Sequence, residues 1–450
     1  MGMGRKENRF DGFMFSYHLA WTLAVLPCLP FLPLIRKGRL GRRLVPDLPG
    51  TDPRRNNLWV HALSVGEVIS ALPLLDALYT RHPERGLVFT AATSRGLAVA
   101  AERLPDRVSG PAPMPVDFWW SMRRMIRSVR PALFVLVETD IWPGLLDRLR
   151  RKGIKSILVN GRVSPGTFRS YRRFRRISRK MFDPLSLCLT QSALDTERLL
   201  AVGVPPEKVV TAGNIKFDRE IPPMGESERV EWLGALGFSP DHVIWVAGST
   251  HPGEEEAVLG TFKRLMSAFP ALRLVLAPRQ VARSREIAAT AREMGLRPAL
   301  RTGDREERGA SHDVLVLDTL GELDRVYGLA HVAFVGGSLV PFGGHNLLEP
   351  AGFGCPVVFG PHTHNFVSMS RSLEAAGGGI RVADGAALYR TLKALLEDGA
   401  ARKRMGGRAR RFMEENRGAM DRVLNAIDTL LAETPARDHS GTGRTFGGIL

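Results

Sequence analysis

The stretch HVAFVGGSLVPFGGHNLLEPAGFGCPVVFGP, residues 331–361, carries the clearest fold signal in this sequence. It contains an apolar run, a glycine-rich loop, a helix that we expect to begin near His345, and a second apolar run. A strand, a helix and a strand in this order form a βαβ unit, in which the two strands lie parallel in one sheet. Glycines let backbone N–H groups approach a phosphate, and the start of a helix attracts an anion. The stretch therefore predicts an α/β fold with a phosphate-binding loop at a strand end.

Similar apolar runs, rich in Val, Ile and Leu, recur along the chain and alternate with longer helical patterns. The N-terminal set lies at 58–63, 87–93, 132–138, 156–160 and 185–190. The C-terminal set lies at 242–249, 272–278, 313–318, 331–337 and 356–360. We interpret the two sets as two doubly wound parallel sheets with a cleft between them. Such sheets bind ligands beyond the carboxyl ends of their strands.

Domain boundaries follow from the same runs. Two Rossmann-like domains are predicted at residues 45–218 and 241–432. Residues 219–240 are rich in proline, glycine and acidic side chains, and we interpret them as a linker. Residues 1–44 form a hydrophobic anchor with a basic flank, and residues 433–450 are predicted to be a disordered tail.

Composition limits the class of protein. The chain has 450 residues, enough for two or three domains, and 44% hydrophobic content excludes global disorder. Its 63 Lys and Arg against 46 Asp and Glu give a net charge of +17, which favours an anionic partner such as nucleic acid, a phosphorylated substrate or a membrane surface. Cys28, Cys188 and Cys355 form no CxxC pair, so a disulfide framework and a cysteine zinc site are excluded.

The N-terminal segment is the strongest membrane signal. Residues 13–35 contain no Asp, Glu, Lys or Arg and would extend about 35 Å as a helix, enough to cross a bilayer. Pro27, Pro30 and Pro33 interrupt the second half, so a helix is predicted only for 13–26, and a monotopic or kinked anchor stands beside a straight span. Basic residues follow without an acid up to Arg43, which places the rest of the chain on the cytoplasmic side.

Two glutamates follow strand runs at positions suited to chemistry. Glu67, in the loop HALSVGEV, lies at the start of a predicted helix. There it either stabilises the helix by about 0.3–1 kcal/mol through its interaction with the helix dipole, or it serves as a general base. Glu349 follows the glycine-rich loop and could accept hydrogen bonds from both hydroxyls of a ribose. Alternatively, its carboxylate accepts hydrogen bonds only from groups of the protein itself.

Other site classes lack support in the sequence. There is no GxxxxGK[ST] and no strand-linked GxGxxG, which disfavours a P-loop NTPase and a dinucleotide enzyme. Glu138 and Asp140 resemble a metal-binding pair, and His362 and His364 resemble another. Alternate strand residues share a face for packing reasons too, so no metal site is predicted.

The sequence resembles the bacterial 3-deoxy-D-manno-octulosonic acid (Kdo) transferases of lipopolysaccharide synthesis. The resemblance spans about residues 13–430. It rests on the motifs WVHALSVGEV, ETDIWPGLL, NGRVSPGTFRSY, GNIKFD, AGSTHPGEE, LAPR and GGHNLLEPAGFGCPVVFGP, in the family's order. It implies an inverting GT-B glycosyltransferase of the inner membrane that moves Kdo from CMP-Kdo to a lipid A precursor, lipid IVA, without a metal or another cofactor. The domain at 45–218 would bind the acceptor, and the domain at 241–432 would bind the nucleotide sugar.

The resemblance also implies roles for individual residues. Glu67 would be the catalytic base, while Glu138 and Lys216 would assist charge stabilisation. The implied CMP contacts are Pro278, Arg279, Leu320, Gly321, Glu322, Asn346, Leu347, Leu348 and Glu349. The family usually has histidine after this arginine, whereas Gln280 stands here, so any role for that imidazole is lost or relocated.

Basic residues gather between 148 and 180, where thirteen Lys or Arg occur with no acid. A charged run is often only a solvated face, but beside an anchor it also fits a phosphate-rich glycolipid in an anionic membrane, at about 1 kcal/mol per basic residue. Nucleic acid is not expected, because the segment 171–180 offers only Tyr171 and Phe174 for base stacking. The predicted acceptor and membrane contacts are Arg172, Arg173, Arg175 and Arg176.

Two alternatives remain open from the sequence. One is a sugar-nucleotide epimerase of similar architecture, which would not need a membrane anchor. The other is a membrane protein that binds polyanions without catalysis.

Overall fold

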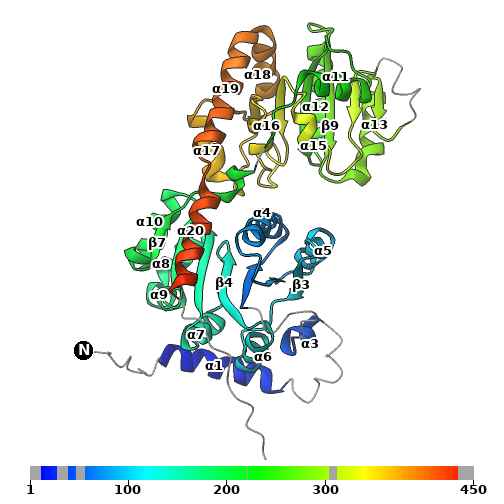
Figure 1. Ribbon diagram of the computed structural model, residues 1–450. Coiled ribbons are helices and arrows are strands. Elements are labelled where there is room, and N and C mark those ends of the chain that lie inside the picture. Colours follow the sequence, from blue (N-terminus) through cyan, green and yellow to red (C-terminus); the bar gives the residue numbers. More distant parts are fainter. Residues whose placement is uncertain (1–11, 28–38, 47–55, 220, 304–311, 434–450) are drawn as a thin grey trace, which may run out of the picture. The chain divides into compact units, whose positions relative to one another are not determined.

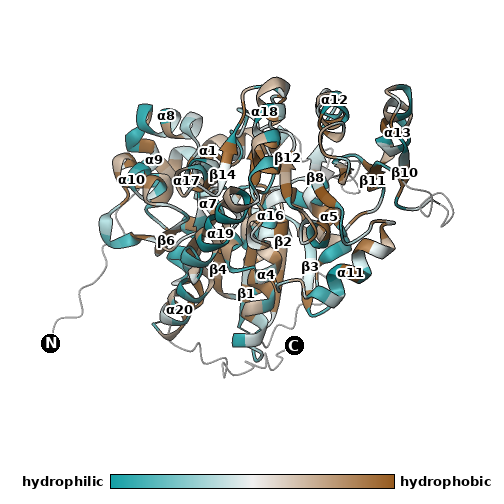
Figure 2. Cartoon of the chain, turned by 90° about the horizontal axis from the view of Figure 1, so that it is seen from above, coloured by the Kyte–Doolittle hydropathy of each residue, from teal (hydrophilic) through white to brown (hydrophobic). Residues whose placement is uncertain are grey.

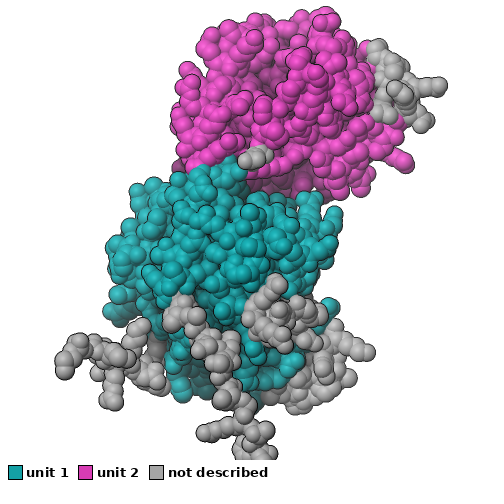
Figure 3. Space-filling view, viewed as in Figure 1, with its two compact units in different colours: residues 1–218, 418–450 teal, residues 219–417 magenta. Residues whose placement is uncertain are grey.

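The computed structural model describes residues 12–27, 39–46, 56–219, 221–303 and 312–433. The chain divides into two compact units, Met1–Asp218 with Gly418–Leu450, and Arg219–Arg417 (Figure 3). The second half of the predicted anchor, the first part of its basic flank with Arg36 and Lys37, and the predicted tail from residue 434 lie outside the described residues.

In the described part of the first unit, seven parallel strands form one sheet in the order β3-β2-β1-β4-β5-β6-β7 (Figure 1). The strands are β1 (Asn57–Ala62), β2 (Leu87–Ala91), β3 (Val108–Pro113), β4 (Pro131–Val137), β5 (Lys155–Gly161), β6 (Leu187–Thr190) and β7 (Val209–Thr211). Successive side chains point to opposite faces, so Leu58 and Val60 enter one core and Trp59 enters the other. Burial of both faces explains why the central strands are mostly apolar (Figure 2).

Helices cover both faces of this sheet. One face packs against α4, α5 and α20, and the other against α6, α7 and α10. The helices of the unit are α1 (Gly12–Val25), α3 (Arg39–Leu44), α4 (Val65–Arg81), α5 (Ser94–Arg103), α6 (Trp119–Val129), α7 (Pro143–Arg151), α8 (Pro165–Arg173), α9 (Arg175–Phe182), α10 (Ala193–Val202) and α20 (Ala419–Ala432), with the 3-10 helices η2 (Pro206–Lys208) and η3 (Ile215–Asp218).

The described part of the second unit repeats this plan with a parallel sheet in the order β10-β11-β9-β8-β12-β13-β14. Its strands are β8 (Val243–Thr250), β9 (Leu272–Pro278), β10 (Pro298–Leu300), β11 (Val314–Val316), β12 (Val332–Val335), β13 (Val357–Phe359) and β14 (Gly379–Arg381). Its helices are α11 (Glu226–Ala235), α12 (Glu255–Met266), η4 (Val281–Arg283), α13 (Ser284–Glu293), α15 (Leu323–Tyr327), α16 (Leu348–Gly352), α17 (Val367–Ala375), α18 (Gly385–Glu397) and α19 (Gly399–Glu415).

Each sheet has a switch point, where the strand order reverses direction. In the first unit it lies between β1 and β4, and in the second between β8 and β12. Connections leave opposite faces of the sheet at such a point and open a crevice at the carboxyl ends of the strands. The loops that follow β1, β4, β8 and β12 are therefore the places where each unit is built to hold a ligand.

The expected linker needs correction. Residues 226–235 form α11, whose Leu233 is buried, and Leu236 and Phe238 join the same core of the second unit. The dense prolines and glycines at 222–225 mark a turn before this helix and do not mark a long flexible connection.

The expected extent of the second domain also needs correction. Helix α20 buries Val423 and Ile427 in the core that contains α4 and β1, so it belongs to the first unit although it follows the second in sequence. Residues 219–417 form the second unit, and the predicted end at 432 is too late.

Helix α1 appears where the sequence predicted it and lies against α7. Met14 and Val25 are buried, and the Tyr17 hydroxyl donates to Asp117 Oδ2 over 2.6 Å. Its other side exposes a second row of large apolar side chains, Phe15, Leu19 and Leu23. None of the helices within the described ranges is both long and apolar enough to cross a bilayer.

Candidate functional site

Glu67 lies at the switch point of the first sheet, in the first turn of α4. Its carboxylate accepts a hydrogen bond from the Leu63 backbone N–H over 2.5 Å and another from Ser64 Oγ over 3.2 Å. Burial raises the pKa of Glu67 to about 7, the negative charges of Glu138 and Asp140 add to this rise, and the two hydrogen bonds oppose it. A carboxyl group that titrates near neutral pH is suited to take and release a proton.

Glu138 and Lys216 join this site from β4 and from η3. Glu138 directly follows β4 with a φ of 58°, a backbone conformation that is rare for residues with a Cβ and costly to maintain. Its Oε1 lies 3.5 Å from Lys216 Nζ. The structure thus brings the three residues predicted for catalysis to the carboxyl end of the strands of one sheet.

Asp140, whose sequence position suggested only a metal ligand, also lies at this end of the sheet. Its Oδ2 accepts a hydrogen bond from Trp142 Nε1 over 2.8 Å and lies 3.2 Å from His61 Nε2. His61 is fully buried, and its other ring nitrogen contacts Thr90. Sequence reasoning missed this arrangement, because His61 and Thr90 look like ordinary members of two strands.

In the second unit, Glu254 organises the switch point. This fully buried carboxylate accepts backbone N–H groups from His251 at 3.0 Å, Gly337 at 2.6 Å, Ser338 at 2.9 Å and Leu339 at 2.8 Å. The first part of the glycine-rich loop therefore binds an anion that the protein itself supplies. The prediction that this whole loop cradles a phosphate is wrong for residues 337–339, since their N–H groups are already engaged.

Two histidines lie beside this loop. His251 Nε2 and His345 Nε2 are 2.8 Å apart, and the ring of Phe342 stacks on His251 with centroids 4.0 Å apart. Burial, with the nearby Arg279 charge, lowers the pKa of His345 to about 4 and lowers that of His251 as well. Both rings are thus held neutral beside Arg279, the residue that Gln280 follows in this chain.

The remaining predicted CMP contacts divide into two groups. Pro278 ends β9, and Arg279 is exposed just beyond it, with its backbone N–H donating to Thr250. Leu320 is 78% exposed, and Gly321 takes a φ of 89° in the same loop.

The Glu322 carboxylate is hydrogen-bonded to Arg301 and Thr319. Burial would raise its pKa, but hydrogen bonds from Arg301, 2.9 Å away, and from Thr319 outweigh this effect and hold the pKa below the usual value. The carboxylate of Glu322 therefore stays ionised, and its negative charge is balanced by the guanidinium of Arg301.

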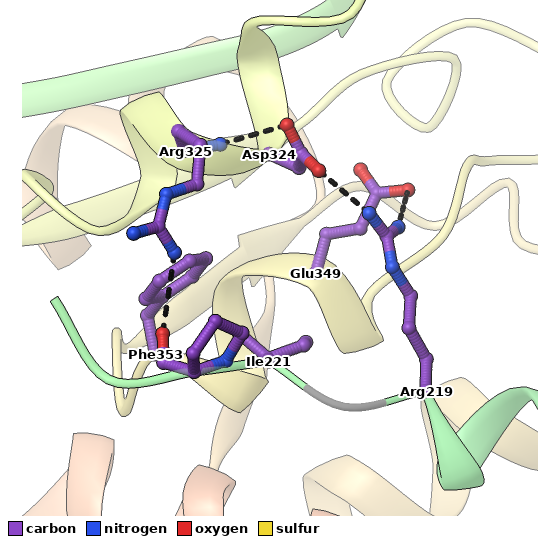
Figure 4. A pocket seen from close by; sticks show the side chains of 7 residues that line it. Arg219, Ile221, Asp324, Arg325, Glu349 and Phe353 are labelled. Carbon is purple, nitrogen blue, oxygen red and sulfur yellow. Dashed lines mark hydrogen bonds and ion pairs between the residues drawn. The ribbon is translucent and has the colours of Figure 1, made fainter.

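A cavity of about 300 Å³ opens beside Glu349 (Figure 4). Ile221, Pro222 and Phe353 give it apolar walls. At its rim, Arg219 donates to Asp324 over 2.6 Å and lies 3.8 Å from Glu349 Oε1.

The residues around Glu349 differ in two respects from the prediction. The helix begins at Leu348 and not near His345, so Glu349 stands in its first turn. Asn346 Nδ2 donates to Glu349 Oε1 over 3.2 Å, while Asn346 Oδ1 accepts the Leu348 N–H and so starts the helix. The side chains of Leu347 and Leu348 are buried in the protein interior and are not presented to a ligand. Burial raises the pKa of Glu349, which Arg219 and Asn346 oppose.

The predicted basic residues form an exposed patch. Arg172 and Arg173 end α8, Arg175 and Arg176 begin α9, and all four side chains are exposed. Lys180, also on α9, lies over the ring of Phe13 of α1 at 5.7 Å, so the patch continues to the N-terminal helix.

Among the described residues, no cluster of three or more His, Cys, Asp or Glu side chains has the geometry to hold a metal ion. Glu138 and Asp140 instead contact Lys216 and His61.

Two doubly wound parallel sheets, each with polar side chains at its switch point, resemble the two Rossmann-like domains of the GT-B glycosyltransferase fold. The fold matches a UDP-N-acetylglucosamine 2-epimerase with a TM-score of 0.58 at 15% identity, covering 86% of this chain and 100% of that one. This likeness concerns the fold alone.

Sequence relatives identify the family. A family model described as 3-Deoxy-D-manno-octulosonic-acid transferase (kdotransferase) matches residues 37–219. The 3-deoxy-D-manno-octulosonic acid transferase of Haemophilus influenzae is 34% identical over 84% of this chain and 88% of its own length. That of Bordetella pertussis is 33% identical over 88% of this chain and 91% of its own. The chain belongs to the 3-deoxy-D-manno-octulosonic acid transferase family and is a glycosyltransferase, which overrules the epimerase and the non-catalytic alternatives.

Proposed function

We propose that this enzyme transfers Kdo from CMP-Kdo to lipid IVA with inversion at the anomeric carbon, and that Glu67 is the general base. The observation that carries the proposal is the position of Glu67, a carboxyl group with a pKa of about 7 at the switch point of the first sheet. Attack by a sugar hydroxyl releases a proton as the new bond forms. A positioned base that takes this proton contributes about 10²–10⁴-fold to the rate.

Glu138 and Lys216 support this chemistry. Their ion pair holds a cation at the same end of the sheet as Glu67. When the bond between Kdo and CMP breaks, negative charge grows on the phosphate, and a fixed cation stabilises that charge. Arg279, exposed at the end of β9, supplies a second cation in the nucleotide-binding unit.

The donor nucleotide is proposed to bind in the second unit. Glu349 lines a cavity with an apolar wall, which suits a nucleoside whose ribose hydroxyls donate to a carboxylate. Arg219 and Asn346 contact the Glu349 carboxylate. The ribose hydroxyls would replace part of these contacts.

The acceptor and the membrane are proposed to meet the first unit at α1, α8 and α9. The exposed row on α1, Phe15, Leu19 and Leu23, offers apolar side chains, while the opposite side of the helix packs on the protein. A helix held in this way lies in the plane of the interface and does not span. Its neighbour, the α8–α9 basic patch of Arg172, Arg173, Arg175 and Arg176, suits lipid phosphates. We therefore propose attachment to the cytoplasmic face of the inner membrane.

One assay tests the proposed reaction. The purified enzyme is incubated with CMP-Kdo and lipid IVA, and the mass of the lipid product is read directly. A mass increase by one or more Kdo units is expected, and the anomeric configuration by NMR should be opposite to that in the donor. No mass increase, or a retained configuration, would contradict the proposal.

A further inference from the structure

One buried carboxylate joins helix α1 to the start of α7. Asp117, in the loop after β3, is only 1% exposed. Its Oδ1 accepts the Leu145 N–H over 2.7 Å, and its Oδ2 accepts the Gly144 N–H over 2.7 Å. The same Oδ2 accepts the Tyr17 hydroxyl of α1 over 2.6 Å. Three segments that are distant in the sequence therefore meet on Asp117.

Asp117 supplies the cap that α7 does not provide for itself. The first N–H groups of an α-helix have no partners inside the helix. α7 begins at Pro143, which has no N–H, and the side chain of the preceding Trp142 makes no capping hydrogen bond. The next two N–H groups, of Gly144 and Leu145, both donate to Asp117. The position of the α7 start thus depends on where Asp117 is held.

Glycine at position 144 permits this close approach. A Cβ there would lie 2.7 Å from Asp117 Oδ1, nearer than side chains tolerate. Alanine is otherwise favoured over glycine in a helix. The glycine therefore leaves the space that the capping carboxylate needs.

Helix α1 holds Asp117 from the other side. Val25 of α1 is buried in a small apolar cluster with Val116 and Phe118. These two residues flank Asp117 in the loop. Burial raises the pKa of Asp117 to about 6, and the hydrogen bond from Tyr17 is the strongest of the contacts that oppose this rise. Tyr17 thus helps to keep the carboxylate charged, and hydrogen bonds to a charged acceptor are the stronger ones.

The start of α7 also ends the loop that carries Glu138. β4 fixes one end of this loop, residues 138–142, and α7 fixes the other. Glu138 has a φ of 58°, a conformation that persists only when the surrounding structure maintains it. Trp142 closes the loop: its Nε1 donates to Asp140 over 2.8 Å, and its carbonyl accepts the Leu146 N–H of α7 over 3.0 Å. A shift of the α7 start would therefore act on Glu138 through only four intervening residues.

We propose that Tyr17 and Asp117 are positioning residues for Kdo transfer, which fix the start of α7 and, through it, the backbone of Glu138. The inference rests on the proposed role of Glu138 in charge stabilisation. It gives the two sides of α1 different functions. The exposed apolar row contacts the membrane, whereas Tyr17 on the packed side supports the catalytic loop.

The test is steady-state transfer by the full-length enzyme to lipid IVA in detergent micelles, where attachment to a bilayer is not needed. Tyr17→Phe removes only the hydroxyl and should lower kcat roughly tenfold with the KM for CMP-Kdo unchanged, because small displacements of a catalytic group cost rate. Gly144→Ala, which displaces the carboxylate from the α7 side, should lower kcat in the same way. Tyr79→Phe, the same change at an exposed site of α4, is the matched control and should leave kcat unchanged. A wild-type kcat in Tyr17→Phe, or a rise in KM alone, would overturn the inference.

Two further measurements separate positioning from anchoring. Tyr17→Phe should sediment with anionic vesicles as the wild type does, because the exposed row of α1 is unchanged; lost vesicle binding would show that the hydroxyl only anchors α1, against the inference. Hydrogen exchange followed by mass spectrometry should be faster over residues 138–146 of Tyr17→Phe and unchanged over 187–190, the strand β6. Equal exchange over 138–146 in variant and wild type would contradict the proposed coupling.

Glu138→Gln distinguishes this inference from the proposed function. If Tyr17 acts through Glu138, Tyr17→Phe should lower kcat little further in the Glu138→Gln enzyme, and additive losses would count against the inference. Wild-type transfer by Glu138→Gln would instead refute the proposed role of Glu138 and the inference with it. A wild-type kcat in Tyr17→Phe beside an impaired Glu138→Gln would overturn the inference alone.

Discussion

Replacing Glu67 by glutamine tests catalysis and stability in one variant. The amide oxygen can still accept the Leu63 N–H and the amide nitrogen can donate to Ser64, so the local hydrogen bonds survive. The proton acceptor is lost. We expect Kdo transfer to fall by at least about 10²-fold with CMP affinity nearly unchanged.

The same substitution should stabilise the protein at alkaline pH. The folded state raises the pKa of Glu67 from 4.5 to about 7, so folding disfavours the charged form. Stability from this group is full below pH 4.5, falls as the pH rises from 4.5 to 7, and stays low above 7. The rise corresponds to about 3 kcal/mol, and partial solvent contact of the side chain reduces this to about 1–2 kcal/mol. Glutamine carries no charge and avoids the loss.

The assay is thermal melting at pH 5 and pH 8 beside steady-state transfer. Glu67→Gln should melt above the wild type at pH 8, and the difference should narrow at pH 5. Glu102→Gln, an exposed carboxylate on α5 of the same unit, is the matched control and should change neither property. A variant that transfers Kdo near the wild-type rate, or that is less stable than the wild type at pH 8, would refute the reasoning. Glu138 would then be the next carboxylate to examine.

Three further predictions concern binding. Glu349→Gln should weaken CMP binding by about 1–3 kcal/mol in calorimetry, because ribose hydroxyls lose a charged acceptor in a buried site, and unchanged affinity would place the ribose elsewhere. Reversing the charges of the α8–α9 basic patch should impair use of the bisphosphorylated acceptor while CMP binding persists; equal loss of both would show that the patch maintains the fold. Leu19→Glu with Leu23→Glu should release the enzyme from sedimenting anionic vesicles, because both side chains are exposed on α1. Val230→Glu, which changes an exposed side chain on α11, should not release the enzyme, and vesicle binding that survives the double change would exclude α1 as the contact.

The sequence predicted the inner strands of both sheets and missed the strands at all four edges, β3, β7, β10 and β14. An edge strand pairs on one side only and need not be apolar throughout. β3 reads VSGPAP, and its two prolines indicate a loop when the sequence is read alone. The inner strands were visible because both of their faces are buried, which makes their apolar runs continuous.

The position of a candidate site residue was predictable where it lies shortly after an apolar strand, as Glu67 does after β1 and Glu138 does after β4. It was not predictable where function depends on hydrogen bonds between distant segments. His61 meets Thr90 across 29 residues, and Glu254 meets Gly337 across 83. No local pattern marks a buried carboxylate such as Glu254 as the anion that fills its own glycine-rich loop.

Helix α20 gives the chain an unusual order of assembly. The first unit lacks part of its core until this helix, which follows the whole second unit, has been synthesised. At about 5–20 residues per second, the ribosome needs on the order of 10–40 s to make the intervening segment. During that interval the α4 face of the sheet stays exposed and is a natural substrate for chaperones. A nonsense mutation near the end of the gene would therefore damage the N-terminal half of the enzyme, whereas residues 219–417 are continuous and would be the natural fragment to express alone.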